Sequence, residues 1–158
     1  MVLEFSAGGV VFKKRGTSGE VNSSQNNAED VLVLVSQHSY HHGWVFPKGL
    51  IGDKEHLKGE DKIETAVREV EEETGAKGEI LQELTPITYW YQYEGEKRKK
   101  TVYYFLMKYV GGDITIHDHE MEDVIWLPLD QILEKLTYKS DKQVFLEAKP
   151  IIEKLQRK

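Results

Sequence analysis

The sequence contains no cysteine in its 158 residues, which excludes disulfide bonds and metal sites built from thiolates. This absence fits the reducing environment of the cytoplasm, where we expect the protein to act. No run of about 18 apolar residues is present, so no transmembrane helix is predicted. The first residues, M-V-L-E-F-S, lack the basic region and the cleavage site of a secretory signal peptide.

Positive charge is also scarce, since 21 lysine and arginine residues face 27 aspartate and glutamate residues, for a net charge of −6. Such a charge argues against stable, sequence-independent binding to long nucleic acid. A small polyphosphate is still an acceptable ligand, because metal ions and a local group of lysines can offset the negative field. The length and a hydrophobic content of 39% are those of one globular domain, expected to span residues 1–158.

Acidic residues are concentrated in residues 60–76, which read E-D-K-I-E-T-A-V-R-E-V-E-E-E-T-G-A. The spacing of Asp61 and Glu64 predicts a capping box at the start of a helix, and Gly75 predicts a left-handed residue at its end. One side of this helix is expected to hold Ile63, Ala66, Val67, Val70 and Thr74.

The other side of the predicted helix carries Arg68, Glu69, Glu72 and Glu73 within an arc of roughly 140°. Three carboxylates on one face repel one another unless a cation lies between them, and Mg²⁺ prefers oxygen ligands of this kind. Arg68 precedes Glu72 by one turn and is expected to fix it by charge-assisted hydrogen bonds. A glutamate-rich face is more often a solvated helix surface, so the flanking sequence has to decide between the two interpretations.

The flanking sequence favours the metal-binding interpretation. Residues 46–49 read F-P-K-G, and the two segments together resemble the Nudix box, G-x5-E-x7-R-E-U-x-E-E-x-G-U, in which U is a bulky aliphatic residue. Every position from Glu60 to Gly75 matches, and only Ala76 is smaller than usual. Ten residues separate Gly49 from Glu60 where the pattern has five, which predicts a five-residue insertion within residues 50–59.

The remaining sequence predicts strands at residues 7–12, 31–35, 80–93, 101–109 and 123–127. Helices are predicted at residues 129–136 and 140–155, the second with an S-x-x-Q capping box at Ser140 and a kink or split at Pro150. Residues 14–29 predict a flexible hairpin extension. Strands lying between helices predict an α/β/α sandwich with a mixed β-sheet, which the Nudix resemblance also implies.

The resemblance implies a pyrophosphohydrolase that depends on Mg²⁺ or Mn²⁺. Glu69, Glu72 and Glu73 are then the metal ligands, and Gly49 adds a backbone carbonyl if the insertion leaves its loop in place. A further carboxylate, Glu120, precedes Trp126 by six residues, a spacing at which several Nudix subgroups place an extra metal ligand or base. Two neighbours in the same loop compete with Glu120 for this role, namely Asp118 and Glu122.

Residues 93–104 resemble the corresponding segment of diadenosine tetraphosphate hydrolases, a Nudix subgroup. Tyr93 is expected to stack on an adenine, the alternative being that it only shields the sheet. Arg98 and Lys100 are expected to neutralise a phosphate chain together with Lys48, the alternative being a solvated basic turn. Tyr138 matches an aromatic residue of the same subgroup, with a core position as its alternative.

Residues 38–44 read H-S-Y-H-H-G-W, with histidines spaced too closely for a familiar zinc site. We interpret this segment as a loop on the substrate side, with His42 or Trp44 near a base or a phosphate.

The reaction implied by the resemblance is hydrolysis of a phosphate chain, with Glu69 or Glu120 accepting a proton from water and with Arg68 and Glu72 completing the catalytic set. Diadenosine tetraphosphate, cleaved to ATP and AMP, is the favoured small-molecule substrate. Alternatives of the same class are removal of pyrophosphate from RNA 5′ ends and clearance of damaged nucleoside triphosphates. A noncatalytic nucleotide-binding module is the alternative of another class, and the complete R-E-x-x-E-E argues against it.

Overall fold

The computed structural model describes residues 1–15, 30–52 and 59–157. The strands are β1 (Val2–Lys14), β2 (Val31–His38), β3 (Trp44–Val45), β4 (Lys48–Leu50), β5 (Ala76–Glu83), β6 (Ile87–Tyr93), β7 (Glu96–Gly112) and β8 (Met121–Pro128). The helices are α1 (Lys62–Thr74), the 3₁₀ turn η3 (Leu129–Gln131), α2 (Ile132–Lys135) and α3 (Lys139–Gln156).

The strands form one mixed sheet around β1. Its main path runs β3-β2-β1-β7-β5, and β4, β6 and β8 pair with β1, β7 and β2. The β1–β7 pair is parallel, whereas β2 and β4 run antiparallel to β1. Consecutive residues of β1, Val10 and Val11, are both fully buried, as expected for a strand covered on both faces.

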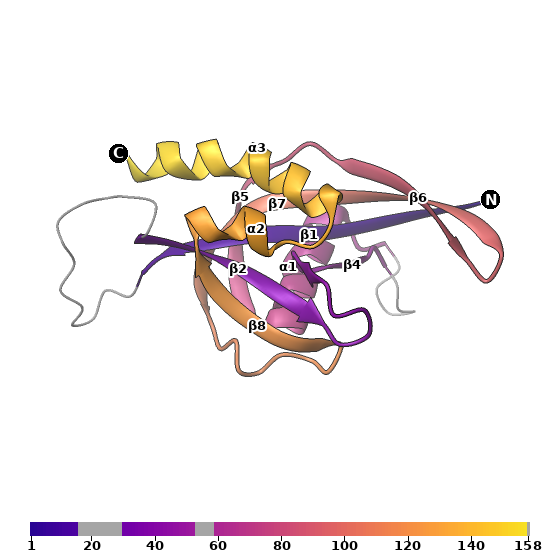
Figure 1. The fold of residues 1–158 in the computed structure, drawn as a ribbon, viewed down its shortest axis with the longest axis horizontal. Helices are drawn as coiled ribbons and strands as arrows, with labels where there is room; N and C mark the ends of the chain where they lie inside the picture. The colour runs from indigo at the N-terminus through magenta and orange to yellow at the C-terminus, as the bar shows by residue number, and fades with distance from the viewer. Residues whose placement is uncertain (16–29, 53–58, 158) are drawn as a thin grey trace.

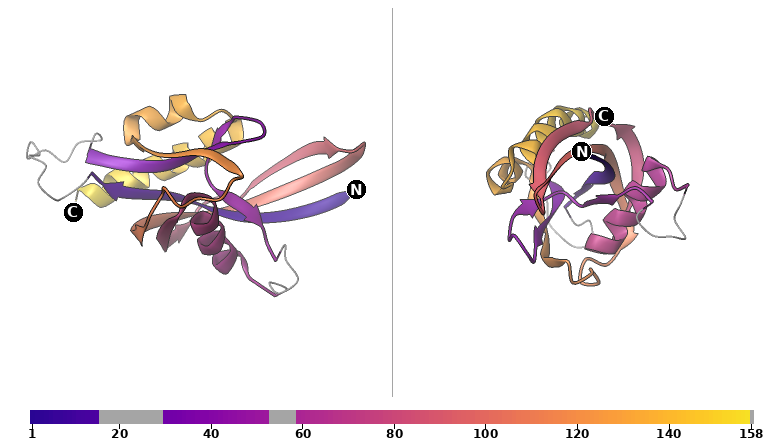
Figure 2. Two further views of the ribbon diagram at one scale, coloured as in Figure 1. Left: turned by 90° about the horizontal axis from the view of Figure 1, so that it is seen from below. Right: turned by 90° about the vertical axis from the view of Figure 1, so that its right-hand side faces the viewer.

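Helices cover both faces of the sheet, with α2 and α3 on one side and α1 on the other (Figures 1 and 2). Val10 belongs to the apolar cluster that includes Val144 and Phe145 of α3. Val11 belongs to a second cluster, which includes Ala66 and Val70 of α1. The period of two along β1 therefore divides the core into two layers, and the predicted α/β/α sandwich is confirmed.

Helix α1 begins and ends where the sequence predicted. The Asp61 carboxylate accepts a hydrogen bond from the Glu64 amide at 2.8 Å, and Gly75 ends the helix with a φ of 83°. The predicted apolar side needs one correction, because Ile63 is 47% exposed. The buried stripe also takes in Glu69 and Glu73, which are 6% and 5% exposed, so two of the predicted ligands point toward the sheet.

Several other boundaries differ from the predictions. The 80–93 segment is divided into β5 and β6, and the helix expected at 129–136 is a 3₁₀ turn followed by one α-helical turn. Helix α3 begins after Tyr138, without a side-chain cap, and not at Ser140. Pro150 does not split α3, because Ala148 and Ile152 on either side of it are buried in the core and hold both halves in place.

Both predicted insertions fall largely outside the described residues. Strands β1 and β2 pair at Lys14 and Val31, and the Arg15 amide donates to the Asp30 carbonyl at 2.7 Å, as at the base of a hairpin. Residues 16–29 of the predicted extension, and residues 53–58 of the predicted loop insertion, are beyond what the structure describes. No helix in the described ranges is long and apolar enough to cross a membrane.

Candidate active site

Two glutamates of α1 point toward the short strand β4. A side-chain carbon added at Gly49 would lie 2.1 Å from the Glu69 carboxyl carbon, so glycine lets the backbone pass this close while Glu69 keeps its present position. The neighbouring Lys48 amide donates to Glu73 Oε1 at 3.3 Å. Strand β4 is held in turn by β1, through the antiparallel pairing of Gly49 with Ala7. The central strand of the sheet therefore positions the backbone that covers these carboxylates.

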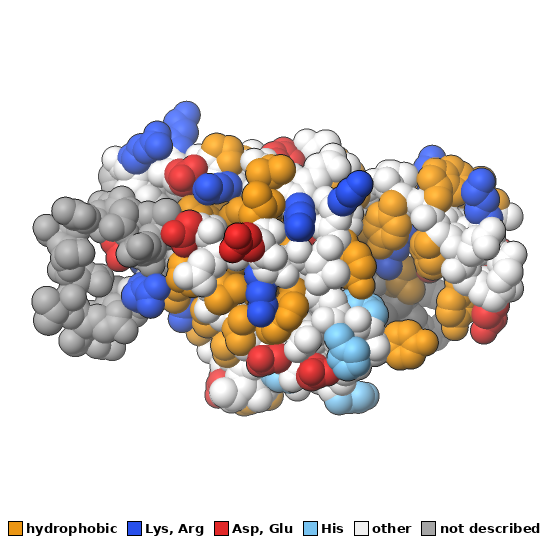
Figure 3. Space-filling view, viewed as in Figure 1, with side chains coloured by type: hydrophobic (Ala, Val, Ile, Leu, Met, Phe, Trp, Pro, Cys, Tyr) orange, Lys and Arg blue, Asp and Glu red, His pale blue; other side chains and the backbone are white. Residues whose placement is uncertain are grey.

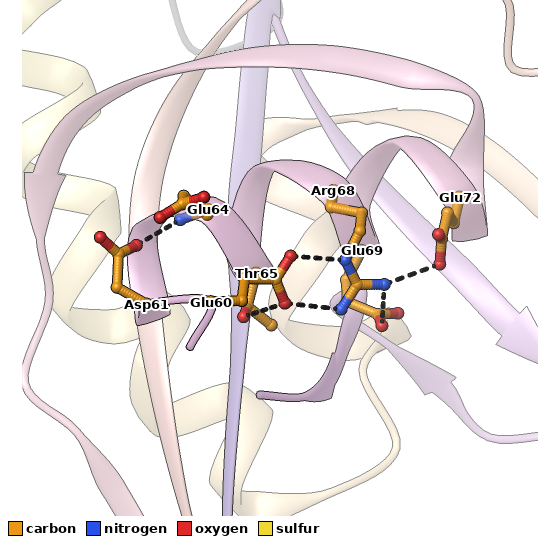
Figure 4. Close-up of polar contacts among 7 residues, drawn as sticks. All are labelled: Glu60, Asp61, Glu64, Thr65, Arg68, Glu69 and Glu72. Atoms are coloured by element: carbon orange, nitrogen blue, oxygen red, sulfur yellow. Dashed lines mark hydrogen bonds and ion pairs between the residues drawn. The ribbon is translucent and has the colours of Figure 1, made fainter. Parts of the chain in front are cut away.

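Arg68 links the acidic residues of α1 into one network (Figure 4). Its Nε and Nη2 donate to Glu60 at 2.8 and 2.9 Å, a two-point contact. Its Nη1 donates to Glu69 at 2.8 Å and to Glu72 at 3.0 Å, so the predicted Arg68–Glu72 contact is confirmed. Hydrogen bonding to Arg68 lowers the pKa of Glu60 to about 2, and a hydrogen bond from the Thr65 hydroxyl at 2.6 Å also favours its charged form.

Sequence reasoning recognised Glu60 as a motif position but assigned it no role. The structure shows that Glu60 is the fixed anchor for Arg68, leaving one guanidinium nitrogen for Glu69 and Glu72. The signal in the sequence is the separation of eight residues between Glu60 and Arg68, which brings the residue before the helix cap alongside the second turn of α1.

Glu73 lies in an environment that disfavours its charge. Burial raises its pKa well above the ordinary value, and the charges of Glu69 and Asp118 raise it further, whereas Lys48 opposes the shift. Like charges crowded in a poorly solvated site favour either a bound proton or a bound cation. The environment of Glu73 is therefore compatible with a bound cation.

The acidic residues line a cavity of about 290 Å³ between α1, β4, β7 and the loop before β8. Its walls are Lys48, Gly49, Leu50, Glu69, Glu72, Glu73, Lys100, Asp118 and Glu120. In the described residues no three side chains already converge as metal ligands, and Arg68 engages two of the carboxylates. The donors are nonetheless all oxygen, and burial together with the nearby Glu69 and Asp118 raises the pKa of Glu73, so the residues fit Mg²⁺ or Mn²⁺.

A second cavity, of about 340 Å³, continues from the first. Its lining residues are His38, His41, Val45, Phe46, Lys48, Glu73, Tyr89, Tyr91, Lys100, Glu120 and Met121. The two cavities share Lys48, Glu73, Lys100 and Glu120, so they form one depression. Burial lowers the pKa of Lys100, and the nearby charge of Lys48 lowers it further. Two lysines held this close in a partly dry site are suited to an anion that carries several charges.

The aromatic residues of β6 enter the site differently from the prediction. Tyr89, Tyr91 and Tyr93 alternate along β6 and share one face, but the cavity lining includes only the first two. Tyr93 is 54% exposed nearer the hairpin turn, and its ring centre lies 5.1 Å from the Arg98 guanidinium carbon. Arg98 also contacts Glu4, at 3.6 Å, and is not among the lining residues. Because alternate residues of a strand share a face, the positions two and four residues before Tyr93 identify Tyr91 and Tyr89 as residues of the same face.

Histidines gather on one part of the surface (Figure 3). Two histidines, His38 and His41, line the second cavity. Their rings stack with centres 4.3 Å apart. His41 Nδ1 accepts a hydrogen bond from the Gly43 amide at 3.0 Å and lies 2.9 Å from the Tyr138 hydroxyl. Because Nδ1 is an acceptor, the proton of the neutral ring is on Nε2. Burial lowers the pKa of His41, as do the nearby His38 and Lys48. Tyr138 is absent from the lining but holds His41 in place.

The two residues singled out in this loop by sequence reasoning lie elsewhere. His42 contacts Glu122 at 2.9 Å on the surface, and the Trp44 ring lies 4.2 Å from the Lys135 ammonium. Glu122 is therefore directed away from the cavity, whereas its competitors Asp118 and Glu120 line it. The Ser39 hydroxyl donates to the Glu120 carbonyl at 2.9 Å, which ties this acidic loop to the histidine loop.

Residues 21–148, most of the chain, match the family profile of the NUDIX domain. The chain belongs to the Nudix family. It is 37% identical to the Mycobacterium tuberculosis protein named MutT4 over 72% of its own length, but spans only 44% of that relative. It is 30% identical to the 8-oxo-(d)GTP phosphatase of Mycolicibacterium smegmatis and spans 39% of it. With the asymmetrical bis(5′-nucleosyl)-tetraphosphatase of Rattus norvegicus it shares 31% identity over 77% of this chain and 80% of that protein.

Solved structures have the same fold. The Bacillus halodurans MutT protein superposes with a TM-score of 0.68 at 20% identity, covering 92% of this chain and 82% of that one. The Caenorhabditis elegans Ap4A hydrolase in a binary complex gives a TM-score of 0.61 at 24% identity, covering 94% and 97%. At such identities the likeness concerns the Nudix fold alone.

A larger depression, of about 1000 Å³, lies on the outer side of the Nudix helix α1. It includes Arg68 and Glu72 but neither of the lysines Lys48 and Lys100, and its other walls include Ile63 and Ile116. Because the larger depression lacks both lysines and the buried glutamates, the smaller depression on the other side of the Nudix box is the better candidate for the active site.

Proposed function

We propose that this Nudix protein is a metal-dependent pyrophosphohydrolase that cleaves the phosphate chain of a nucleotide. The observation that carries the proposal is the single depression with three chemical zones. Glu69, Glu72 and Asp118 line only the first cavity, and the tyrosine and histidine rings line only the second. The lysines Lys48 and Lys100 line both cavities, together with Glu73 and Glu120. A nucleoside with a phosphate chain has complementary parts in the same order, namely metal-bound phosphates, further phosphates and a base.

The metal ligands in this proposal are Glu69, Glu72, Glu73 and Glu120, with the Gly49 carbonyl as a backbone donor. A bound Mg²⁺ or Mn²⁺ would lower the pKa of a coordinated water and offset charge on the phosphate oxygens. The geometry favours Glu69 and Glu73 as the inner ligands, because β4 covers both. Glu72 reaches the site from a more exposed position, held by Arg68.

The chain's own residues supply the remaining chemistry. Glu69 or Glu120 accepts the proton of the attacking water, since both line the cavity and a carboxylate suits this task at neutral pH. Lys48 and Lys100 neutralise charge that grows on the phosphate chain toward the transition state. Arg68 acts indirectly by fixing the rotamers of two glutamates, and Glu60 fixes Arg68.

Diadenosine tetraphosphate, cleaved asymmetrically to ATP and AMP, is our favoured substrate. The rat relative is an asymmetrical bis(5′-nucleosyl)-tetraphosphatase and is matched over most of its length. A dinucleotide also needs two places for a base, and the site has aromatic groups on two separate elements. Tyr89 and Tyr91 belong to β6, whereas His41 belongs to the β2–β3 loop and is held by Tyr138.

Hydrolysis of an oxidised nucleoside triphosphate is the second candidate. Its support is the 30% identity to the mycobacterial 8-oxo-(d)GTP phosphatase, of which this chain spans less than half. Such a substrate has one base, so one of the two aromatic groups would be left without a ligand.

A Mg²⁺-dependent turnover panel with product analysis tests both candidates. The panel contains diadenosine tetraphosphate, ATP, dGTP, 8-oxo-dGTP and 5′-triphosphorylated RNA, each with the parent protein and with the Glu73→Gln variant. ATP and AMP in equal amounts, with dinucleotide cleavage faster than that of any triphosphate, support the first candidate. Two ADP molecules as products, or faster cleavage of 8-oxo-dGTP than of the dinucleotide, reject the first candidate. Binding of nucleotides with no turnover in any of the Mg²⁺-containing reactions rejects the proposal that the protein is a hydrolase.

A further inference from the structure

A buried carboxylate outside the proposed chemistry, that of Asp141, lies in the first turn of α3 and is only 3% exposed. Its Oδ1 accepts a hydrogen bond from the Phe46 amide at 3.1 Å, and the buried Tyr104 hydroxyl provides another hydrogen bond. Burial raises the pKa of Asp141, and the nearby charge of Lys48 opposes the shift. A carboxylate is retained in such a place only when its hydrogen bonds are satisfied, so these contacts are specific.

The Phe46 amide, which donates this hydrogen bond to Asp141, belongs to the turn between β3 and β4. Two residues later, Lys48 enters the substrate depression and its own amide donates to Glu73. The Pro47 carbonyl accepts the Gly9 amide of β1 at 3.1 Å. The turn is therefore held at three successive residues by three different elements, α3, β1 and α1. Of these contacts, only the one to α3 is made by a side chain that the proposed reaction does not use.

Packing places Asp141 where it can reach this amide. Phe145 follows Asp141 by one helical turn, and its ring centre lies 6.4 Å from that of Phe46. The Phe46 ring also lies edge-on to Tyr104, with centres 6.3 Å apart. The Phe46 side chain and its amide are thus both held by the same face of α3, which fixes the direction in which the chain continues toward Lys48.

We propose that Asp141 is a positioning residue that holds the β3–β4 turn and so aims Lys48 at the phosphate chain. The inference rests on the proposed function, because Lys48 has a task only if a phosphate chain binds. Asp141 lines neither cavity, and its hydrogen bond to the Phe46 amide connects it to the turn that carries Lys48. Displacement of a charged group by about 1 Å is enough to reduce turnover strongly.

A general loosening of α3 is the competing explanation, and the same helix supplies a matched control. Glu147, farther along α3, accepts hydrogen bonds from the Thr85 amide at 2.8 Å and from the Thr85 hydroxyl at 3.0 Å. Glu147→Ala therefore also removes two hydrogen bonds between α3 and the sheet layer, without touching the turn. Equal losses in Asp141→Ala and Glu147→Ala would show that Asp141 serves stability alone and would overturn the proposal.

The kinetic test is a double-mutant cycle with Lys48→Met on the best substrate of the panel. Asp141→Ala should lower kcat by at least about tenfold, whereas Asp141→Asn, which keeps an acceptor for the Phe46 amide, should stay within about threefold. In the Lys48→Met background Asp141→Ala should cost less than about threefold, since its target is already gone. A full additional tenfold loss there would refute the link to Lys48.

Hydrogen exchange of residues 44–50 in the nucleotide-free protein tests the structural step without any turnover. Asp141→Ala should speed exchange of the Phe46 amide by at least about tenfold, and Asp141→Asn and Glu147→Ala should change it little. If Asp141→Ala does not fold, Asp141→Ser replaces it, because its shorter side chain cannot reach the amide. Faster exchange in a protein that hydrolyses no nucleotide would reject the proposed function alone. Unchanged exchange would reject the role of Asp141, whatever the activity.

Discussion

Replacing Gly49 by alanine should displace Glu69, a proposed metal ligand, without disturbing the fold. The backbone of Gly49 is not in the left-handed region, so alanine is acceptable to the strand itself. Its new methyl carbon would lie 2.1 Å from the Glu69 carboxyl carbon and 2.3 and 2.4 Å from the two oxygens. Contacts of this kind do not fall below 3.0 Å, so the carboxylate has to retreat by roughly 0.9 Å, the difference between these values.

The size of the effect follows from what holds Glu69. The Glu69 carboxylate accepts a hydrogen bond from Arg68 Nη1 at 2.8 Å. A retreat of roughly 0.9 Å strains or breaks this hydrogen bond. Crowding of this type typically costs about 1–3 kcal/mol of stability, or about 2–4 °C in Tm for each kcal/mol. Misplacing a catalytic group by about 1 Å can cost on the order of 10²-fold in rate. We therefore expect a modest loss of stability and a large loss of kcat.

The assay is kcat at saturating Mg²⁺ alongside thermal unfolding in metal-free buffer. Gly111→Ala is the control, since Gly111 has a φ of 155° and open space around its missing side chain, far from the cavity residues. That variant should lose stability through backbone strain and keep its kcat. If Gly49→Ala retained near-normal kcat at saturating Mg²⁺, the reasoning that places Glu69 beneath Gly49 as a metal ligand would be wrong.

Four further predictions follow from the site. Glu73→Gln should lower kcat by at least about 10²-fold in the turnover panel, as expected when a metal-held carboxylate is lost. In metal-free unfolding experiments, the raised pKa of Glu73 should cost the parent protein stability as pH rises above the ordinary value of 4.5, and Glu73→Gln should remove that decline. Glu60 has its pKa lowered to about 2, so its stabilisation should be present above pH 4.5 and be lost toward pH 2, and acid unfolding of Glu60→Gln should lack this loss. In steady-state kinetics, Tyr91→Ala should raise KM for a dinucleotide by about 5- to 150-fold, which is the loss expected when one base no longer stacks on an aromatic ring. Tyr93→Ala should raise KM by less. Lys100→Ala should lower kcat in addition to raising KM.

The sequence alone determined the local features. The start and end of α1 depend on Asp61 and Gly75, whose preferences act within a few residues and need no tertiary contact. Valine-rich segments flanked by polar residues predicted the first strands, and the order of strands and helices predicted the layered fold. The contact between Arg68 and Glu72 was also predictable, because one helical turn separates them.

Other features were beyond local reasoning because they depend on which surface of an element meets another. One such feature is which side of α1 faces the sheet. In the structure this side includes Glu69 and Glu73, whereas Ile63 is exposed. The cap expected at Ser140 was overridden in the same way, since packing of α3 starts the helix after Tyr138. Propensity at a helix end is worth about 1 kcal/mol, less than burial of an apolar helix face can supply.

The site itself was only partly readable from the chain. The spacing from Glu60 to Gly75 and the F-P-K-G turn indicated the acidic end and Lys48. The resemblance to a Nudix subgroup also indicated Lys100. Only the tertiary structure brought Tyr91 and His41 to the same depression, through sheet register and loop packing. The contact between Asp141 and the Phe46 amide spans 95 positions, and no periodicity in the sequence connects such distant residues. Local spacing determines which groups share a helix face, whereas long-range packing decides which groups from different elements meet.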